Sequence, residues 1–134
     1  DPTAFSRIDP RRNASGVWSF LESKGDETTG LRCIASGTVG LWQAGGELTG
    51  SMTQEGRCAV PGSEFDNSGE FGLLGGVVRD NQLAFRVSND FETCDYAGEF
   101  EGPNRFSLRG QVNCTIELDD GVLINLLGSW SALR

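Results

Sequence analysis

The sequence predicts an all-β fold: a single antiparallel up-and-down β-barrel of about eight strands that follows an extended N-terminal arm. Three observations lead to this prediction. From Gly16 onward, the chain falls into short runs rich in Val, Ile, Thr, Phe and Trp. Clusters of Gly, Asp, Asn and Pro separate these runs. No segment has the periodicity of an amphipathic helix. An antiparallel sheet of this size can close on itself, which removes its exposed edges.

The elements follow one another in a simple order. Residues 1–15 form the predicted arm, because they hold two of the four prolines and lack both strand and helix periodicity. Residues 16–134 form the barrel domain. Its strands are predicted at residues 16–23, 31–43, 46–58, 70–79, 82–89, 93–102, 105–118 and 122–132.

A short pattern, apolar-x-Gly-x-apolar, recurs along these strands. Residues two apart face the same side of a strand, so each glycine is expected to point inward between two apolar neighbours. A missing side chain at such a position permits sharp coiling or close approach of the backbone. The glycines in this pattern are Gly37, Gly50, Gly75, Gly98, Gly110 and Gly128.

The turns fix the strand register and thereby pair the cysteines. A two-residue turn at Gly45-Gly46 places Cys33 opposite Cys58, and a turn centred on Asn104 places Cys94 opposite Cys114. Directly opposed residues of an antiparallel pair lie within disulfide distance. We therefore predict two disulfides, which implies an oxidising, extracytoplasmic location, periplasmic or secreted. The cysteine spacings are not those of a metal site, and no metal or cofactor is expected.

A third hairpin, closed by Asp119-Asp120-Gly121, pairs Ile116 with Ile124 and keeps the same parity. The side chains assigned to the interior are then almost wholly apolar, so a ligand held inside would be apolar too. These residues are Trp18, Phe20, Val39, Leu41, Leu48, Met52, Leu73, Val77, Leu83, Phe85, Val87, Tyr96, Phe100, Phe106, Leu108, Val112, Ile116, Leu118, Val122, Ile124, Leu126 and Trp130.

Composition excludes several classes of function. With 19 acidic and 11 basic residues, the net charge is −8, which argues against nucleic-acid binding because that depends on clustered Lys and Arg. The chain has no histidine, which removes His-based triads and proton shuttles. No apolar run is long enough to span a membrane, so membrane association is expected only through a partner.

Carboxylates are the titratable groups that remain for catalysis. By parity, Asp95, Glu99 and Glu101 point to solvent, and Glu99 falls opposite Arg109 in a surface ion pair. We therefore expect a protein without catalytic residues that is not an enzyme.

Two motifs at the ends of the barrel domain resemble a known pattern. Gly16-Val17-Trp18 lies on the first strand, and Arg134 follows Trp130 on the last. This resembles the calycins, the group that contains lipocalins, fatty-acid-binding proteins and avidins. The resemblance implies that Trp18 closes one end of the barrel beneath Arg134. A second resemblance, to small lipocalin-like bacterial inhibitors of metalloproteases, implies protease inhibition by the arm as a minor alternative.

The leading functional hypothesis is protein–protein contact. Apolar residues at outward positions indicate that part of the surface is covered, either by the arm through Phe5 and Ile8 or by another protein. We expect an accessory or stabilising subunit of a larger extracytoplasmic complex, which includes membrane-associated complexes. The residues expected to bind the partner are Phe5, Arg7, Ile8, Arg11, Arg12, Trp42, Leu123 and Leu127.

The alternative hypothesis is a lipocalin-like or avidin-like carrier of a small apolar ligand inside the barrel. Aromatic residues at inward positions would line its pocket. These residues are Trp18, Phe85, Tyr96, Phe100 and Trp130.

Overall fold

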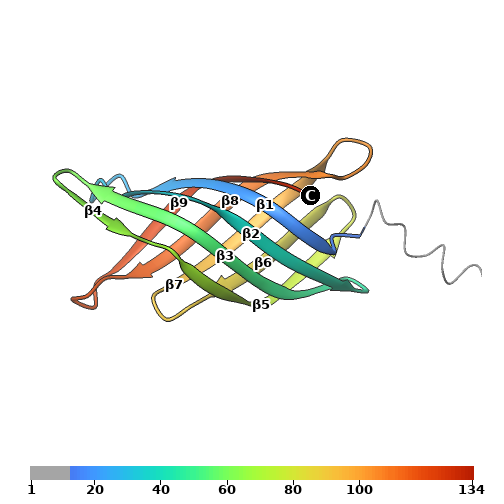
Figure 1. Cartoon of the computed structure of the whole chain (residues 1–134), viewed down its shortest axis with the longest axis horizontal. Coiled ribbons are helices and arrows are strands. Elements are labelled where there is room, and N and C mark those ends of the chain that lie inside the picture. The colour runs from blue at the N-terminus through green and yellow to red at the C-terminus, as the bar shows by residue number, and fades with distance from the viewer. Residues whose placement is uncertain (1–12) are drawn as a thin grey trace, which may run out of the picture.

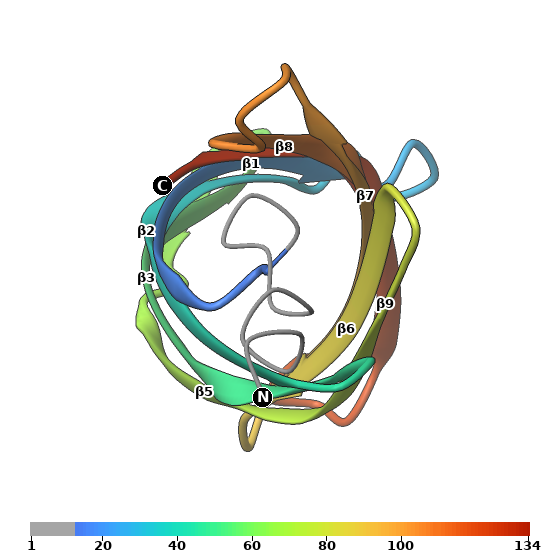
Figure 2. The ribbon, with the colours of Figure 1, turned by 90° about the vertical axis from the view of Figure 1, so that its right-hand side faces the viewer.

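The computed structural model, which describes residues 13–134, is a tilted antiparallel barrel (Figure 1). Its sheet runs in the order β2-β1-β9-β8-β7-β6-β5-β3-β4, and β2 also pairs with β3, which closes the wall (Figure 2). The strands are β1 (Gly16–Gly25), β2 (Arg32–Ala44), β3 (Glu47–Val60), β4 (Ser63–Asp66), β5 (Gly69–Arg79), β6 (Gln82–Ser88), β7 (Glu92–Glu101), β8 (Ser107–Glu117) and β9 (Leu123–Leu133).

The all-β fold class and the closed barrel are confirmed. Each predicted strand is present, and β4 is an addition that the sequence reading missed. This short strand pairs with residues 57–60 of β3, whereas β5 pairs with residues 51–54. The end of the long strand β3 would otherwise be an unpaired edge on that side, and β4 covers it. The division into arm and barrel stays a prediction, because residues 1–12 lie outside the described residues.

The predicted registers and disulfides are also confirmed. Cys33 pairs with Cys58 across β2 and β3, and Cys94 pairs with Cys114 across β7 and β8. In each disulfide the Cα atoms are 4.0 Å apart. The two disulfides indicate an oxidising environment.

Glycines allow the wall to coil tightly at several of the predicted positions. A Cβ atom at Gly110 would lie 1.8 Å from the Ala97 carbonyl oxygen, and one at Gly128 would lie 1.8 Å from the Ser23 carbonyl oxygen. No side chain fits in such a space. Gly75 differs, because its added Cβ would meet nothing and the register of β5 against β6 shifts between Leu73 and Gly75.

The register shift corrects part of the predicted interior. Val77 was expected inside but is exposed, because the bulge beside Gly75 reverses the parity of the strand after it. Phe106 and Val122 are exposed as well. They precede the first residues of β8 and β9, so strand parity does not apply to them. Phe71, which the prediction omitted, is part of the core.

Candidate functional site

One end of the barrel, which we call the capped end, is closed by Trp18 and Arg134. The Arg134 guanidinium lies 4.5 Å from the centre of the Trp18 ring, and the Trp18 indole N–H donates to the Ala14 carbonyl over 2.8 Å. Arg134 also donates to the carbonyl oxygens of Asn13, Ser15 and Arg105. Burial and the nearby Arg105 lower the pKa of Arg134. The geometry places both residues as the calycin resemblance implied.

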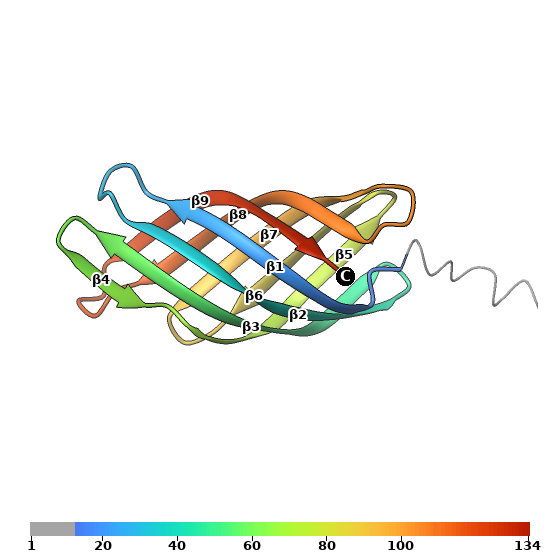
Figure 3. The same cartoon turned by 45° about the horizontal axis from the view of Figure 1, so that its top comes forward.

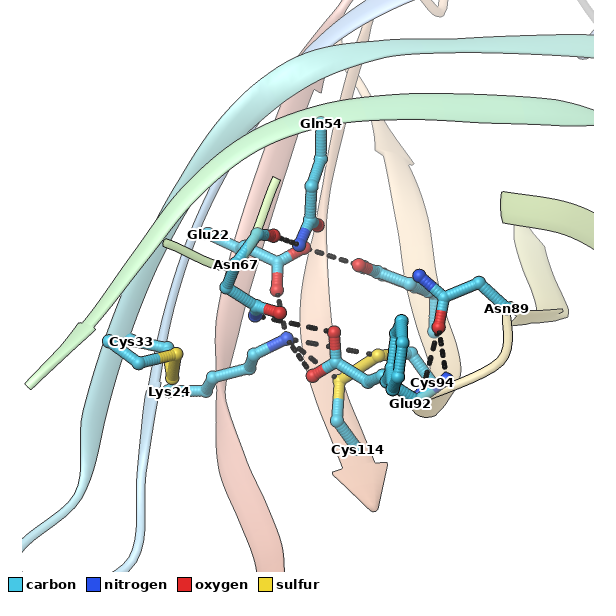
Figure 4. Close-up of polar contacts among 12 residues, drawn as sticks. Glu22, Lys24, Cys33, Gln54, Asn67, Asn89, Glu92, Cys94 and Cys114 are labelled. Carbon is cyan, nitrogen blue, oxygen red and sulfur yellow. Dashed lines mark hydrogen bonds and ion pairs between the residues drawn. A yellow bond between two sulfur atoms is a disulfide. The ribbon is translucent and has the colours of Figure 1, made fainter. Parts of the chain in front are cut away.

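The opposite end, which we call the polar end, holds charged side chains inside the barrel. Alternate residues of β1 point into the barrel, so Glu22 and Lys24 at the end of this strand point inward like Trp18 and Phe20. The Lys24 ammonium lies 2.8 Å from Glu22 Oε2 and 2.9 Å from Glu92 Oε2, and all three side chains are fully buried. Figure 4 shows Lys24 and Glu92 reaching toward each other from β1 and β7. These strands are not neighbours in the sheet, so the contact crosses the lumen.

Further polar groups surround this cluster. The Tyr96 hydroxyl donates to Glu22 Oε1. The side-chain amide of Gln54 donates to the Asn67 carbonyl over 2.7 Å, and the Asn67 side chain reaches Glu92 Oε1 at 3.4 Å. Gln54 is 2 % exposed, and its Oε1 atom has no hydrogen-bond partner among the described residues. Accepting oxygens therefore outnumber the hydrogen-bond donors that reach them.

Two groups of the cluster have shifted pKa values. Burial would lower the pKa of Lys24, but the charges and hydrogen bonds of Glu22 and Glu92 outweigh it, so the pKa is raised overall. Burial, together with the negative charge of Glu22, raises the pKa of Tyr96 well above its ordinary value. Lys24 is therefore charged and Tyr96 neutral over the physiological range.

A disulfide adjoins the cluster. The Lys24 ammonium is 3.1 Å from Cys114 Sγ and 3.8 Å from Cys94 Sγ. Glu92, Cys94 and Cys114 lie close enough together to bind a metal ion. However, the sulfurs are joined to each other and lack the thiolate charge that a metal requires, and Lys24 already fills the space beside them.

Aromatic rings fill the lumen between the two ends. Phe85 stacks on Tyr96 with ring centres 4.9 Å apart, and Trp130 meets the edge of Tyr96 at 5.4 Å. Trp18 and Phe100 lie 6.2 Å apart nearer the capped end. The residues predicted to line a ligand pocket thus contact one another, and a ligand among them would have to separate the rings.

The outer wall carries a second candidate site over β9, β1 and β2, which lie side by side in Figure 3. The outward side chains there form rows without charge, and we call them the uncharged face. The rows, read across the three strands, are Leu133–Ser19–Thr38, Ser131–Leu21–Ser36 and Ser129–Ser23–Ile34.

Charged residues border the middle row of this face on both sides. The middle row continues to Arg109 on β8 and to Glu55 on β3. A groove of about 1080 Å³ runs over this part of the wall, lined among others by Leu21, Ile34 and Ser131. Leu21 and Ile34 are 65 % and 64 % exposed, although both are large and apolar. Six of the nine side chains in these rows are serine or threonine, and the exposed aliphatic side chains of Leu21, Ile34 and Leu133 lie among them.

The structure places the predicted partner-binding residues in two groups. Trp42, Leu123 and Leu127 are exposed on β2 and β9, outside the three uncharged rows. Phe5, Arg7, Ile8, Arg11 and Arg12 lie outside the described residues. The sequence reading missed Leu21 and Ile34, although both alternate with inward residues of their strands.

The outward carboxylates are nearly as predicted. Asp95, Glu99 and Glu101 lie on the outer wall, and Glu99 pairs in register with Arg109. The ion pair of Arg109, however, is made with Glu101 at 3.4 Å. Glu99 instead accepts a hydrogen bond from the Gln82 side chain.

Together, the closed barrel and the Trp18–Arg134 cap define a calycin-like architecture of the lipocalin or avidin type. No protein-family model and no curated protein sequence matches the chain. Among solved structures, the S-type phycobiliprotein lyase CPES from Guillardia theta matches with a TM-score of 0.49 and 10 % identity, over 97 % of this chain and 92 % of that one. The described residues include no helix long and apolar enough to cross a membrane.

This comparison corrects the expectation that the protein is not an enzyme. The matching structure is described as a lyase, so the non-enzymatic assignment is withdrawn. The physical error was to judge the carboxylates by Asp95, Glu99 and Glu101, which point to solvent, and to overlook the titratable side chains that point inward. Glu22, Lys24, Glu92 and Tyr96 are titratable, buried and in contact with one another. At this level of likeness, the lyase activity is that of the other protein.

Proposed function

We propose that the protein is an extracytoplasmic, periplasmic or secreted, accessory subunit that binds another protein through its uncharged face. The observation that carries this proposal is the absence of charge from three adjacent rows of the outer wall. The chain as a whole has a net charge of −8. The three rows carry no charge, and they expose the large aliphatic side chains of Leu21 and Ile34. Both features support burial of this face against a partner.

The chemistry of the face also indicates the kind of partner. Six of the nine side chains carry a hydroxyl group and three are aliphatic, so the partner surface is expected to combine hydrogen-bonding groups with apolar area. Arg109 on the β8 border favours an acidic group at the corresponding edge of the partner. A second copy of this chain fits less well, because two chains of charge −8 repel each other.

The test compares two leucines of almost equal exposure. Leu21 lies on the uncharged face and is 65 % exposed, and Leu74 lies on β5 and is 66 % exposed. We expect native mass spectrometry of the gently isolated protein to show a stoichiometric complex with another chain. Leu21→Glu should abolish that complex, and Leu74→Glu should leave it intact.

Three results would count against the subunit role. The wild-type protein could run alone, it could form only homodimers, or both variants could behave identically. Circular dichroism and the disulfide count of each variant show whether the barrel has folded, so that unfolding is not mistaken for lost binding.

Carriage of an apolar ligand remains the second candidate, supported by the calycin-like architecture. Its test is titration with hydrophobic ligands while tryptophan fluorescence is followed. Saturable quenching that disappears in Phe85→Ala supports a carrier, and unchanged fluorescence supports a packed lumen. Protease inhibition by the arm stays a minor prediction, tested by comparing the chain with and without residues 1–15.

A further inference from the structure

The polar end of the barrel combines three features that are unfavourable for the stability of a barrel interior. It is fully buried, it has a formal charge of −1 from Glu22, Glu92 and Lys24, and it contains two acceptor atoms without a hydrogen bond, Gln54 Oε1 and Glu22 Oε2. A buried polar atom without a partner destabilises the folded state. A buried, uncompensated charge costs more. Such an arrangement is stable when a further group supplies both positive charge and hydrogen-bond donors.

The unsatisfied acceptor of Gln54 points into this cluster. Gln54 enters from β3, and its donor group is held by the Asn67 carbonyl, which fixes the orientation of the amide. Figure 4 shows the Gln54 side chain directed from β3 toward Glu22. Each carboxylate oxygen of Glu22 and Glu92 has two lone pairs. One hydrogen bond reaches each of three of these oxygens, and Glu22 Oε2 has only its ion pair with Lys24. Gln54 Oε1 and these oxygens thus offer several accepting positions to one small occupant.

We propose that this cluster is a binding site for a small monocation that donates hydrogen bonds, of the ammonium and primary alkylammonium class. A positive charge would bring the cluster to neutrality, and its N–H groups would be shared between Gln54 Oε1 and the carboxylates. The Tyr96 hydroxyl donates to Glu22 Oε1 and keeps lone pairs that can accept a hydrogen bond from the cation. A neutral occupant such as water would satisfy Gln54 but leave the negative charge.

Access would be through the segments that cover this end. Asn67 precedes β5, and Asn89 belongs to the connection between β6 and β7. The side-chain contact from Asn67 to Glu92 is long at 3.4 Å and therefore weak. The Asn67 backbone N–H donates to the Gly56 carbonyl over 2.8 Å, so entry at this point requires the Asn67 segment to separate from β3.

The test uses four chloride salts at matched ionic strength: ammonium, methylammonium, potassium and tetramethylammonium. Potassium resembles ammonium in charge and size but has no donors, and tetramethylammonium is larger and also has none. We expect ammonium and methylammonium to raise the melting temperature saturably, and the other two to have no specific effect. A direct readout on the wild-type protein is the NMR signal of ¹⁵N-ammonium, whose protons should show contacts to the ring of Tyr96, the single tyrosine.

Two variants locate the effect. Gln54→Met removes the unsatisfied acceptor of Gln54 and should weaken ammonium binding by about tenfold or more. Gln82→Met, on the exposed outer wall, is the matched control and should bind like the wild type. Equal stabilisation by potassium would overturn the proposal, because the site would then recognise charge alone. No saturable effect and no bound ammonium signal would overturn it too, and would leave Gln54 with a water molecule only.

Discussion

Lys24 at the polar end and Arg134 at the capped end are cations that the barrel stabilises by different means. At the polar end, the fully buried Lys24 is paired with the carboxylates of Glu22 and Glu92. At the capped end, the partly buried Arg134 lies over the Trp18 ring and donates to backbone carbonyls, none of which is charged. One cation is thus held by opposite charge and the other by an aromatic face and peptide dipoles. Comparing Lys24 with Arg134 therefore separates the effect of burial on the unfolding free energy from the effect of pairing with opposite charge.

The largest expected effect comes from removing the buried lysine. Lys24→Met leaves two carboxylates in the interior without a counter-charge. Breaking a buried ion pair from one side costs about 3–5 kcal/mol. Urea denaturation with intact disulfides measures this loss. A loss below about 1 kcal/mol, the range of a surface pair, would show that water reaches the cluster.

The capped end should lose less when its cation is removed. Arg134→Met forfeits the contact with the Trp18 ring and the hydrogen bonds to carbonyl oxygens, but it leaves no unpaired charge behind. We expect a loss of about 2 kcal/mol, measured by the same denaturation. Arg134→Lys keeps the charge but loses the planar fork, so its stability should fall between those of Arg134→Met and the wild type. A loss for Arg134→Met equal to that of Lys24→Met would contradict the distinction between the two ends.

Alkaline pH should act on one end only. The folded-state pKa of Lys24 is raised above its ordinary 10.5, and that of Tyr96 is raised well above 10.0. In each case the folded state holds the proton more tightly. The stability from this linkage is therefore fully present below about pH 10 and is lost as pH rises through the folded-state pKa values. Arg134 stays charged over this range.

The pH dependence can be assigned with three variants. Unfolding free energies of the wild type measured from neutral to alkaline pH should fall above about pH 10. Lys24→Met and Tyr96→Phe should each flatten part of this fall, and Arg134→Met should leave its slope unchanged. If Arg134→Met changed the slope of unfolding free energy against pH, the alkaline titration would belong to the capped end, which would contradict this prediction.

The sequence predicted the two ends unequally. Trp18 and Arg134 followed from the calycin resemblance, because a motif on the first strand and a basic residue after the last are visible in the chain. Glu22 and Lys24 were missed, although they continue the inward parity of Trp18 and Phe20. The error was to read an interior as apolar throughout, whereas a buried lysine is acceptable when carboxylates neutralise it.

The partner of Lys24 was beyond sequence reasoning for a different reason. Hairpin turns determine which residues pair within neighbouring strands, and they gave both disulfides correctly. Lys24 and Glu92 lie on strands that are not neighbours, so their contact depends on the diameter and tilt of the closed barrel. The register shift beside Gly75 was likewise unpredictable from alternation, since a bulge breaks the very periodicity on which the reading depends.

The smallest expected effect provides the reference for both ends. Arg86 and Asp95 form an ion pair on the outer wall, with N–O distances of 2.7 and 3.1 Å, and both side chains are more than half exposed. Its geometry is as good as that of the Lys24 pairs, so a difference in energy reports burial and not distance. We expect Arg86→Met to cost about 0–1 kcal/mol and the loss to shrink further in high salt, measured by urea denaturation at two salt concentrations. If Arg86→Met and Lys24→Met lowered the unfolding free energy by the same amount, the contribution of each ion pair would depend on pairing alone. Burial in the lumen would then add nothing to it.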